Sequence, residues 1–377
     1  MIRCQRHLFD IPDEITYLNC AYFSPDLRKV RDAGHLGVNR LSHPWEIKPA
    51  QFFDESEQVR RLFAELIDAT ADDVAIIPAV SYGVAIASSL IEVNKGDEIV
   101  VLQDQFPSNY YPWLELSRRK QARLIVVPRP ADWDWTGALL EVIHEQTAVV
   151  TVANVHWTDG SLIDLKKVSK TCEQNNAKLV LDLSQSLGVL PISIREINPS
   201  FLISAAYKWL LGPYSFGFIY VSPAYQDKLP LEHNWLNRKK SEDFAGLVNY
   251  RDDFQTGARR FDVGERSNFA LTPMAVAALQ QIHEWRVAEI QKSLSRLTNR
   301  LAMQAAKLGF QVIPAEKRAG HIVGLRFPGQ APAGILERLA EENIFVSLRG
   351  TAMRVSPHLY NTEADIDRLL RVLAQSF

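Results

Sequence analysis

The sequence predicts an α/β fold in which a doubly wound, mainly parallel sheet is followed by a smaller C-terminal α+β domain. Two observations lead to this fold class. Between residues 74 and 221, short and almost wholly apolar runs alternate with helical segments, as in parallel sheets whose two faces are both covered by helices. After Pro223 this regularity ends, and shorter helices and strands of mixed order make up the C-terminal part.

The N-terminal part supplies a short apolar segment and one amphipathic helix before the sheet begins. Residues 17–25 form the apolar segment, which ends in the turn signal Ser24-Pro25. Residues 51–69 carry apolar side chains at helical spacing, and we interpret the resulting stripe as core packing. The stripe consists of Val59, Leu62, Phe63, Leu66 and Ile67.

The sheet is assigned from seven apolar runs and the helical segments between them. Strand, crossover helix and strand at this spacing imply right-handed units. The expected strands are 74–77, 99–102, 124–127, 149–155, 179–181, 201–203 and 216–221. The expected helices are 82–92, 109–121, 137–145 and 165–173.

The C-terminal part begins with a charged and aromatic stretch, 232–260, that lacks periodicity and predicts a loop-rich connection over the surface. One long helix is expected over 273–308. The remaining elements are strands 321–327, 344–348 and 352–356 and helices 333–342 and 362–375. We therefore divide the chain into an N-terminal segment (1–25), a large ligand-binding α/β domain (26–264) and a small α+β domain (265–377).

Charge and composition exclude several classes of function. A formal net charge of -2 gives no electrostatic basis for binding nucleic acid or an anionic membrane. No apolar core of a signal peptide is present at the N-terminus. Residues 74–91 carry no charge and are long enough to span a bilayer, but Pro78, Gly83 and a change of period predict a strand, a turn and a helix there.

The cysteines and histidines predict neither a disulfide framework nor a metal site. Cys4, Cys20 and Cys172 are odd in number and far apart, without a C-x-x-C motif. The histidines include no pair at helical spacing. A reducing cytoplasm suits this pattern, and we expect a cytoplasmic protein without bound metal.

Candidate ligand-binding residues follow the predicted strands, because open α/β sheets bind ligands beyond the carboxyl ends of their strands. Ser81 and Gly83 open a helix after the first strand, where free amides and a hydroxyl suit a phosphate, although ordinary helix starts look similar. Phe106 follows the second strand and could stack on a planar ligand or cap a helix. Trp157 follows the run 149–155.

Two charged residues stand out at neighbouring strand ends. Asp182 follows a buried strand, where a carboxylate needs a cationic or donor partner; its alternative role is a cap for the next segment. Lys208 lies among apolar residues, where desolvation lowers the pKa of an amine and makes it nucleophilic; its alternative is to reach out to water. Together with a phosphate cradle, the two fit pyridoxal phosphate, whose usual partners are a lysine and an aspartate.

Three segments resemble motifs of the class V aminotransferase family. They are DLSQ at 182–185, YKWLLGP at 207–213 and RVSPHLYN at 354–361. The resemblance runs in order from Tyr17 to the C-terminus. It implies pyridoxal-phosphate fold type I and relatives among cysteine desulfurases, selenocysteine lyases, isopenicillin-N epimerase-like proteins and kynureninases.

The resemblance also implies roles for residues around the cofactor ring. Lys208 would form the Schiff base with the cofactor and move the proton at the substrate α-carbon. Asp182 would pair with the pyridine nitrogen and keep it protonated. Phe106 would stack on the ring, and Gln185 would hydrogen-bond its hydroxyl. Trp157 stands where relatives carry a ring-contacting asparagine, and we count it among the substrate-binding residues.

Further roles concern the phosphate and the substrate. Ser81, the Tyr82 amide and Tyr207 would hold the phosphate. Arg354 would bind the substrate α-carboxylate through two hydrogen bonds, with Arg349 nearby; an ion pair at a strand edge is the alternative for both arginines. Tyr22, Tyr110, Trp157 and Trp209 could line an aromatic pocket or serve only packing.

The resemblance implies a homodimer whose active site is completed by the partner's segment 264–268. Relatives carry Gly-Thr where this chain has Gly264-Glu265. The phosphate contact of that segment would therefore shift to Ser267 or Arg266.

The reaction is predicted from a departure from the family pattern. Desulfurases need a mobile cysteine between the two C-terminal arginines, and residues 350–353 are Gly-Thr-Ala-Met. No cysteine falls near a strand-end motif, so a thiol nucleophile is not expected. We expect transamination at the α-carbon of an amino acid. A lyase or epimerase reaction is the alternative, and a non-catalytic binding protein on the same fold is a third hypothesis.

Overall fold

The computed structural model describes residues 1–375, and its centre is a seven-stranded sheet in the order β2-β8-β7-β6-β5-β3-β4. Only β8 runs antiparallel to its neighbours, so the predicted mainly parallel sheet is confirmed. Consequently, the carboxyl ends of β2, β3, β5, β6 and β7 share one edge. The strands are β2 Val74–Ile77, β3 Glu98–Leu102, β4 Arg123–Val127, β5 Thr147–Val152, β6 Lys178–Asp182, β7 Phe201–Ala205 and β8 Gly217–Val221.

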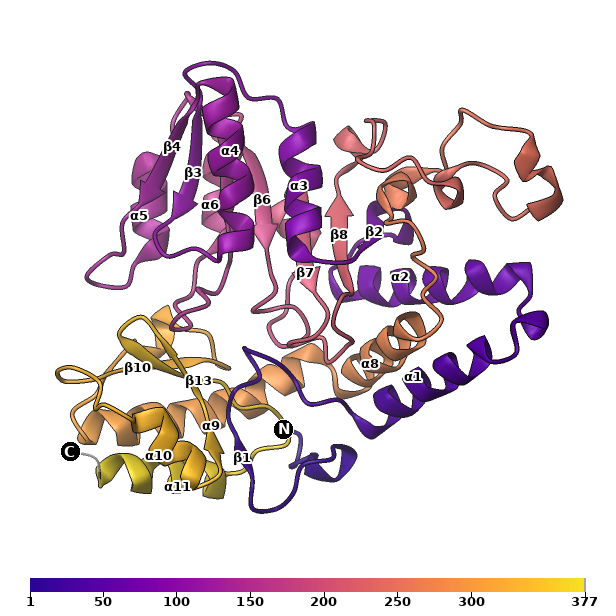
Figure 1. The fold of residues 1–377 in the computed structure, drawn as a ribbon. Coiled ribbons are helices and arrows are strands. Elements are labelled where there is room, and N and C mark those ends of the chain that lie inside the picture. Colours follow the sequence, from indigo (N-terminus) through magenta and orange to yellow (C-terminus); the bar gives the residue numbers. More distant parts are fainter. Residues whose placement is uncertain (376–377) are drawn as a thin grey trace.

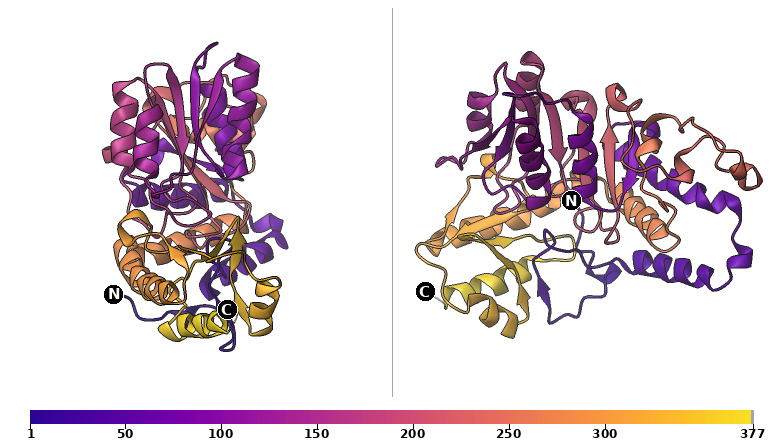
Figure 2. Two further views of the ribbon diagram at one scale, coloured as in Figure 1. Left: turned by 90° about the vertical axis from the view of Figure 1, so that its left-hand side faces the viewer. Right: turned by 45° about the horizontal axis from the view of Figure 1, so that its top comes forward.

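Helices cover both faces of this sheet (Figures 1 and 2). Helices α3 and α4 pack into one hydrophobic core with alternate strand residues such as Ile77 and Ile203. Helices α2, α5, α6 and α8 pack into a second core, to which the strands contribute residues such as Ile76 and Leu181. The doubly wound arrangement is therefore confirmed. The helices are α2 Asp54–Leu66, α3 Val80–Leu90, α4 Tyr111–Lys120, α5 Trp135–Val142, α6 Leu165–Gln174 and the short α7 Ile194–Ile197.

Two features of the helices differ from the sequence-based expectation. The helix α1 (Arg28–Leu41) was not predicted, and it packs along α8 (Figure 1). Its buried residues are only Val30, Gly34 and Gly37, so the sequence contains no apolar stripe from which this helix could be predicted. The helix expected over 273–308 is broken into α8 (Leu271–Trp285) and α9 (Val287–Lys307) at Arg286, whose φ is 64°.

The C-terminal part forms a separate antiparallel sheet in the order β12-β13-β10-β9. The N-terminal strand β1 (Thr16–Tyr17) pairs in parallel with β11 (Ile344–Phe345), next to this sheet. The strand expected over 344–348 is therefore two short strands, β11 and β12. The remaining elements are β9 Gln311–Val312, β10 Val323–Arg326, β12 Ser347–Arg349, β13 Ala352–Val355, α10 Ile335–Glu341 and α11 Glu363–Ala374.

The long connection between the two sheets is loop-rich, as predicted for 232–260, and extends away from the sheet in Figure 1. Residues 74–91 form β2 and α3, as predicted. In the described part of the chain, no helix is long and apolar enough to cross a bilayer. Short 3-10 helices occupy Arg6–Leu8, Pro44–Glu46, Pro49–Phe52, Ala71–Asp73, Pro107–Asn109, Pro223–Tyr225, Trp235–Asn237, Phe244–Val248, Gly257–Phe261 and Ala315–Lys317.

Candidate active site

A cavity of about 270 Å³ opens at the shared carboxyl edge of the large sheet. Its volume is close to the ~300 Å³ at which small-ligand sites begin. The cavity is lined by residues that follow β2, β3, β5, β6 and β7. Most of the residues predicted for the cofactor site line it together, namely Ser81, Phe106, Trp157, Asp182, Gln185, Tyr207 and Lys208.

Lys208 lies in the turn after β7 and is 7% exposed. Burial lowers the pKa of its amine to about 8, against the opposing effect of the Asp182 carboxylate. Its Nζ lies 5.2 Å from the centre of the Phe106 ring and 5.4 Å from that of Tyr207. The amine is therefore held at the cavity close to two aromatic rings, with a much larger neutral fraction near neutral pH than an ordinary lysine has.

Asp182 is the last residue of β6, and its carboxylate is nearly fully buried. Its Oδ1 accepts two hydrogen bonds from Ser184, from the amide at 3.1 Å and the hydroxyl at 2.7 Å. Burial raises the pKa of Asp182, while Ser184 and Lys208 oppose this effect. Because Ser184 occupies Oδ1, Oδ2 is left to face a donor in the cavity. Ser184 was not among the predicted site residues.

The N-terminus of α3 forms one wall of the cavity. A Cβ added at Gly83 would lie 2.8 Å from Ile77 and 2.9 Å from Ile203, so glycine allows the helix to approach the sheet this closely. The Tyr82 amide donates to the Ala79 oxygen at 3.1 Å, and the Tyr82 hydroxyl donates to Glu232 at 2.6 Å. Among the described contacts, the amides left open at this helix start are those of Val80 and Ser81.

Two aromatic side chains form the opposite wall. Phe106 and Trp157 meet edge to face with their ring centres 5.5 Å apart. The indole of Trp157 donates to the Asp104 oxygen at 2.6 Å, which fixes its orientation. Tyr110 and Trp209 do not line the cavity. Asn109 does line it, and its buried Nδ2 has no hydrogen-bond partner; the sequence analysis did not single it out.

The side-chain amide of Gln185 is held by the surrounding protein. Its Oε1 accepts from the Trp209 indole at 2.9 Å, and its Nε2 donates to the Ala21 oxygen at 3.1 Å. The backbone oxygen of Gln185 accepts from the ring of His321 at 2.6 Å. A Gln185 contact with a ligand therefore depends on the remaining hydrogen of Nε2.

Arg354 lies on strand β13 of the small sheet and is 1% exposed; it is not among the residues that line the cavity, but it contacts one of them. Its Nη1 donates to the backbone oxygen of Trp157 at 2.8 Å, and its buried Nε and Nη2 have no hydrogen-bond partner. Burial and the neighbouring Arg349 lower the pKa of its guanidinium to about 9. The predicted alternative for Arg354, an ion pair at a strand edge, is absent from the described structure. These two open donors point to an anionic ligand.

The sequence-based expectation that no cysteine lies near a strand-end motif is wrong for Cys20. Its Sγ lies 4.0 Å from the backbone oxygen of Lys208. The thiol is fully buried, and burial raises its pKa to about 12. Cys20 therefore stays protonated and out of reach of a ligand, so its reactivity as a nucleophile is suppressed.

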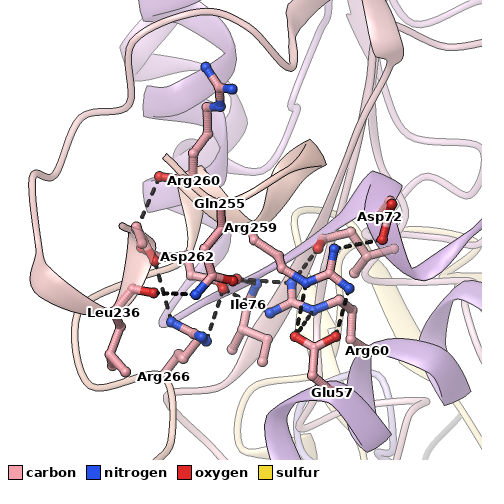
Figure 3. A network of polar contacts seen from close by, with 12 residues as sticks. Glu57, Arg60, Asp72, Ile76, Leu236, Gln255, Arg259, Arg260, Asp262 and Arg266 are labelled. Atoms are coloured by element: carbon pink, nitrogen blue, oxygen red, sulfur yellow. Dashed lines mark hydrogen bonds and ion pairs between the residues drawn. The ribbon is translucent and has the colours of Figure 1, made fainter. Parts of the chain in front are cut away.

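The segment 264–268 does not line the Lys208 cavity within one chain. Figure 3 shows the buried network that fixes it. Asp262 accepts from Arg60 at 2.8 and 3.1 Å, accepts from the Ile76 amide at 2.7 Å and pairs with Arg266 at 3.0 Å. Arg266 pairs with Asp262 through Nε, its buried Nη2 has no hydrogen-bond partner among the described residues, and Ser267 lies buried beside it. A phosphate contact of Ser267 or Arg266 with a partner subunit stays a prediction.

Comparison with known proteins decides the family. The model described as Aminotransferase class-V matches residues 47–369, which is most of the chain. The chain belongs to the class V aminotransferase family. It is accordingly a pyridoxal-phosphate-dependent enzyme of class V with fold type I, as the sequence motifs predicted.

Relatives of this class V protein carry different activities in their names. The Bacillus subtilis (strain 168) protein YcbU, named an uncharacterized aminotransferase, is 27% identical over 330 residues, covering 85% of this chain and 84% of that protein. A probable cysteine desulfurase of Methanothermobacter thermautotrophicus is 23% identical over 337 residues, covering 85% and 83%. A solved structure of a C-DES mutant with glycine covalently linked to the PLP cofactor gives a TM-score of 0.89 at 18% identity, covering 99% and 100%. At that identity the likeness shows the fold alone.

Proposed function

We propose that this class V enzyme is an aminotransferase that acts at the α-carbon of an amino acid. One observation carries the proposal. A lysine of lowered pKa and a buried carboxylate share a cavity, and Arg354, which has two open buried donors, is hydrogen-bonded to the backbone of Trp157 in the lining of that cavity. A purely structural site would leave neither a buried amine unpaired nor two donors of a buried guanidinium without acceptors.

The residues of the cavity fit pyridoxal phosphate. The open amides of Val80 and Ser81 stand at the positive end of α3 and would hold the phosphate, and Tyr207 is close enough to join them. The free Oδ2 of Asp182 would accept the ring N–H, and Phe106 offers its ring as a flat wall. When bound, the cofactor supplies an electron sink for the electron pair released at the substrate α-carbon.

The proposed roles of the protein side chains follow from their environment. Arg354 binds and orients the substrate carboxylate through Nε and Nη2. Lys208 takes the proton from the α-carbon and returns it, because its neutral amine is a base of suitable pKa. Asp182 holds the ring nitrogen protonated. Trp157 and Phe106 exclude water from one side of the cavity.

Desulfuration is not part of the proposal. Residues 350–353 contain no cysteine, and the Cys20 thiol is buried and protonated. A lyase or epimerase reaction is the runner-up, because it begins with the same proton transfer by Lys208.

We also propose a homodimer in which the segment 264–268 reaches the partner's site. Large apolar side chains are exposed along α1 and just after it, at Leu36, Val38, Leu41 and Trp45. This stretch packs against the chain just after 264–268, since a Cβ at Gly37 would lie 2.0 Å from the Phe269 oxygen. We expect Trp45→Glu to shift the mass in light scattering toward a monomer; an unchanged mass in that variant and in Leu36→Asp would contradict the proposal.

The reaction is tested by following an isotope-labelled amino group. Holoenzyme is incubated with a panel of labelled amino acids, with and without an unlabelled 2-oxo acid. Label in the amino acid that corresponds to the added 2-oxo acid, and only when that acid is present, supports transamination. Labelled alanine or labelled ammonia without an acceptor indicates a lyase, and loss of stereochemistry alone indicates an epimerase. Absence of all three with every amino acid, in protein shown to bind the cofactor, contradicts an enzyme acting at the α-carbon.

A further inference from the structure

A second cavity adjoins the one that contains Lys208. The two share Gln105 and Trp157 in their linings. The walls of the second cavity carry three arginines and two aspartates, an unusual density of charge beside an apolar cavity. They are Arg129, Arg326, Arg349, Asp104 and Asp159.

Both aspartates are already bound by two of these arginines. Asp159 pairs with Arg129 and lies 3.4 Å from Arg326. Asp104 lies 3.5 Å from Arg129. Asp159 also accepts two hydrogen bonds from Ser161. These groups therefore neutralise one another and leave no acidic side chain for the third arginine.

Arg349 is the arginine without an acidic partner among the described residues. Its Nη1 donates to the Leu348 oxygen at 2.8 Å, and its buried Nε has no hydrogen-bond partner. Its guanidinium lies 5.7 Å from the centre of the Trp157 ring, on the wall that the two cavities share. The second cavity thus presents one uncompensated positive charge next to the first.

Arg349 and Arg354 lie on the paired strands β12 and β13, and the charges of both lower the pKa of Lys208. Two cations consequently lie near one amine, and in the part of the chain that the structure describes neither is paired with a carboxylate. A carboxylate matches the fork of one guanidinium. The α-carboxylate of the substrate therefore satisfies Arg354 and leaves Arg349 open.

We infer that Arg349 binds a second carboxylate, carried on the substrate side chain, so that the preferred substrates are acidic amino acids and their dicarboxylic 2-oxo acids. This inference rests on the proposed function and adds the substrate class to it. The substrate would lie with its α-carbon at Lys208 and its side chain pointing past Trp157 into the second cavity. The competing arrangement is that both arginines bind the same α-carboxylate.

The test compares acidic with uncharged substrates in four forms of the holoenzyme. kcat/KM is measured for aspartate and glutamate and for alanine and leucine in the wild type, Arg349→Gln, Arg349→Lys and Arg300→Gln. We expect Arg349→Gln to lower the acidic-to-uncharged ratio by about 10- to 100-fold, the size of a lost hydrogen bond to a charged group. Arg349→Lys should retain part of the ratio. The control Arg300→Gln removes an arginine that pairs with Asp367 and lines neither cavity, and it should leave the ratio unchanged.

A second readout does not depend on turnover. Succinate and glutarate carry two carboxylates and no amino group, and their binding to the holoenzyme is measured by calorimetry against butyrate. Tighter binding of a dicarboxylate, weakened in Arg349→Gln, supports the inference even if no amino group is transferred. Two results overturn it: an equal loss for all four amino acids in Arg349→Gln, or no preference for acidic substrates in the wild type. Either result leaves the aminotransferase proposal standing.

Discussion

The Arg354 guanidinium donates a hydrogen bond from Nη1 to the backbone oxygen of Trp157, at 2.8 Å. This contact joins β13 of the small sheet to the loop that follows β5 of the large sheet. It orients the guanidinium so that Nε and Nη2 remain without partners in a buried environment. The position of the proposed carboxylate site is thus set by the way the two sheets meet.

Arg354→Gln should lower kcat/KM for every accepted amino acid by about 100- to 1000-fold, because a charge-assisted pair of hydrogen bonds to the α-carboxylate is lost. Arg354→Lys should recover only part of this loss, since an ammonium lacks the planar fork. Arg300→Gln is the control, because Arg300 forms an exposed ion pair with Asp367, and it should stay within about twofold of wild type. Steady-state kinetics measure these changes in kcat/KM. A loss in Arg354→Gln no larger than that of the control would refute the assignment of Arg354 to the substrate carboxylate.

Covalent capture of pyridoxal phosphate by the cofactor-free protein should accelerate with rising pH. The pKa of Lys208 is lowered to about 8 by burial, and only the neutral amine attacks an aldehyde. The neutral fraction therefore grows as the pH approaches 8 and levels off above it. Stopped-flow absorbance in the visible range measures the rate, and borohydride reduction followed by peptide mass spectrometry locates the label. Lys208→Ala should show no visible band. A band in that variant would show that another amine of the protein binds the cofactor covalently.

Asp262→Asn should destabilise the cofactor-free protein by about 3–5 kcal/mol, because it leaves the buried Arg60 and Arg266 without their shared carboxylate. Figure 3 shows these three side chains together. The midpoint of urea denaturation provides the measurement. Asp72→Asn breaks the ion pair of a largely exposed carboxylate with Arg259 and should cost less than about 1 kcal/mol. Equal losses in the two variants would mean that burial of the Asp262 network contributes nothing.

His358→Phe should make the protein more resistant to acid. Both ring nitrogens of His358 are buried without partners, between the rings of Trp209, Trp285 and Tyr360. Burial lowers the pKa of His358 to about 3, whereas in the unfolded chain it is ~6.5. The unfolded chain therefore binds more protons between these values, and stability falls as the pH falls below about 6.5.

The gain in thermal midpoint from His358→Phe should accordingly be larger at about pH 5 than at about pH 8. His7→Gln, at an exposed position, serves as the control and should change neither midpoint. A gain that is the same at both pH values would show that the mutation acts through packing alone.

Local patterns in the sequence were sufficient for the large sheet and for most of the cavity. The apolar runs that end at Ile77, Leu102 and Asp182 are strands because both of their faces are buried. In a parallel sheet such ends meet at one edge, so Asp182 and Lys208 could be expected to share a site. The helix break at Arg286 had no such pattern, because α8 and α9 continue the same helical spacing on either side of it.

Contacts between distant parts of the chain explain what the sequence did not reveal. Helix α1 docks through Gly34 and Gly37, which carry no apolar side chain to detect. Cys20 reaches the Lys208 backbone from a segment 188 positions away. The lack of an acidic partner for Arg349 becomes apparent only in the structure, where Asp104 and Asp159 pair with other arginines. Partners of this kind depend on tertiary packing and leave no periodic signal.

The pairing of β1 with β11 has a consequence for how the protein matures. Ser356 and Leu18 meet although 338 positions separate them, and residues 16 and 17 pair with residues 344 and 345. During synthesis β1 must therefore wait until residues 344 and 345 have left the ribosome before it can pair. The large sheet can assemble earlier, since its strands end at Val221. Arg354 therefore reaches its place after Lys208 and Asp182, and a nascent chain would gain those two residues before it could hold a substrate.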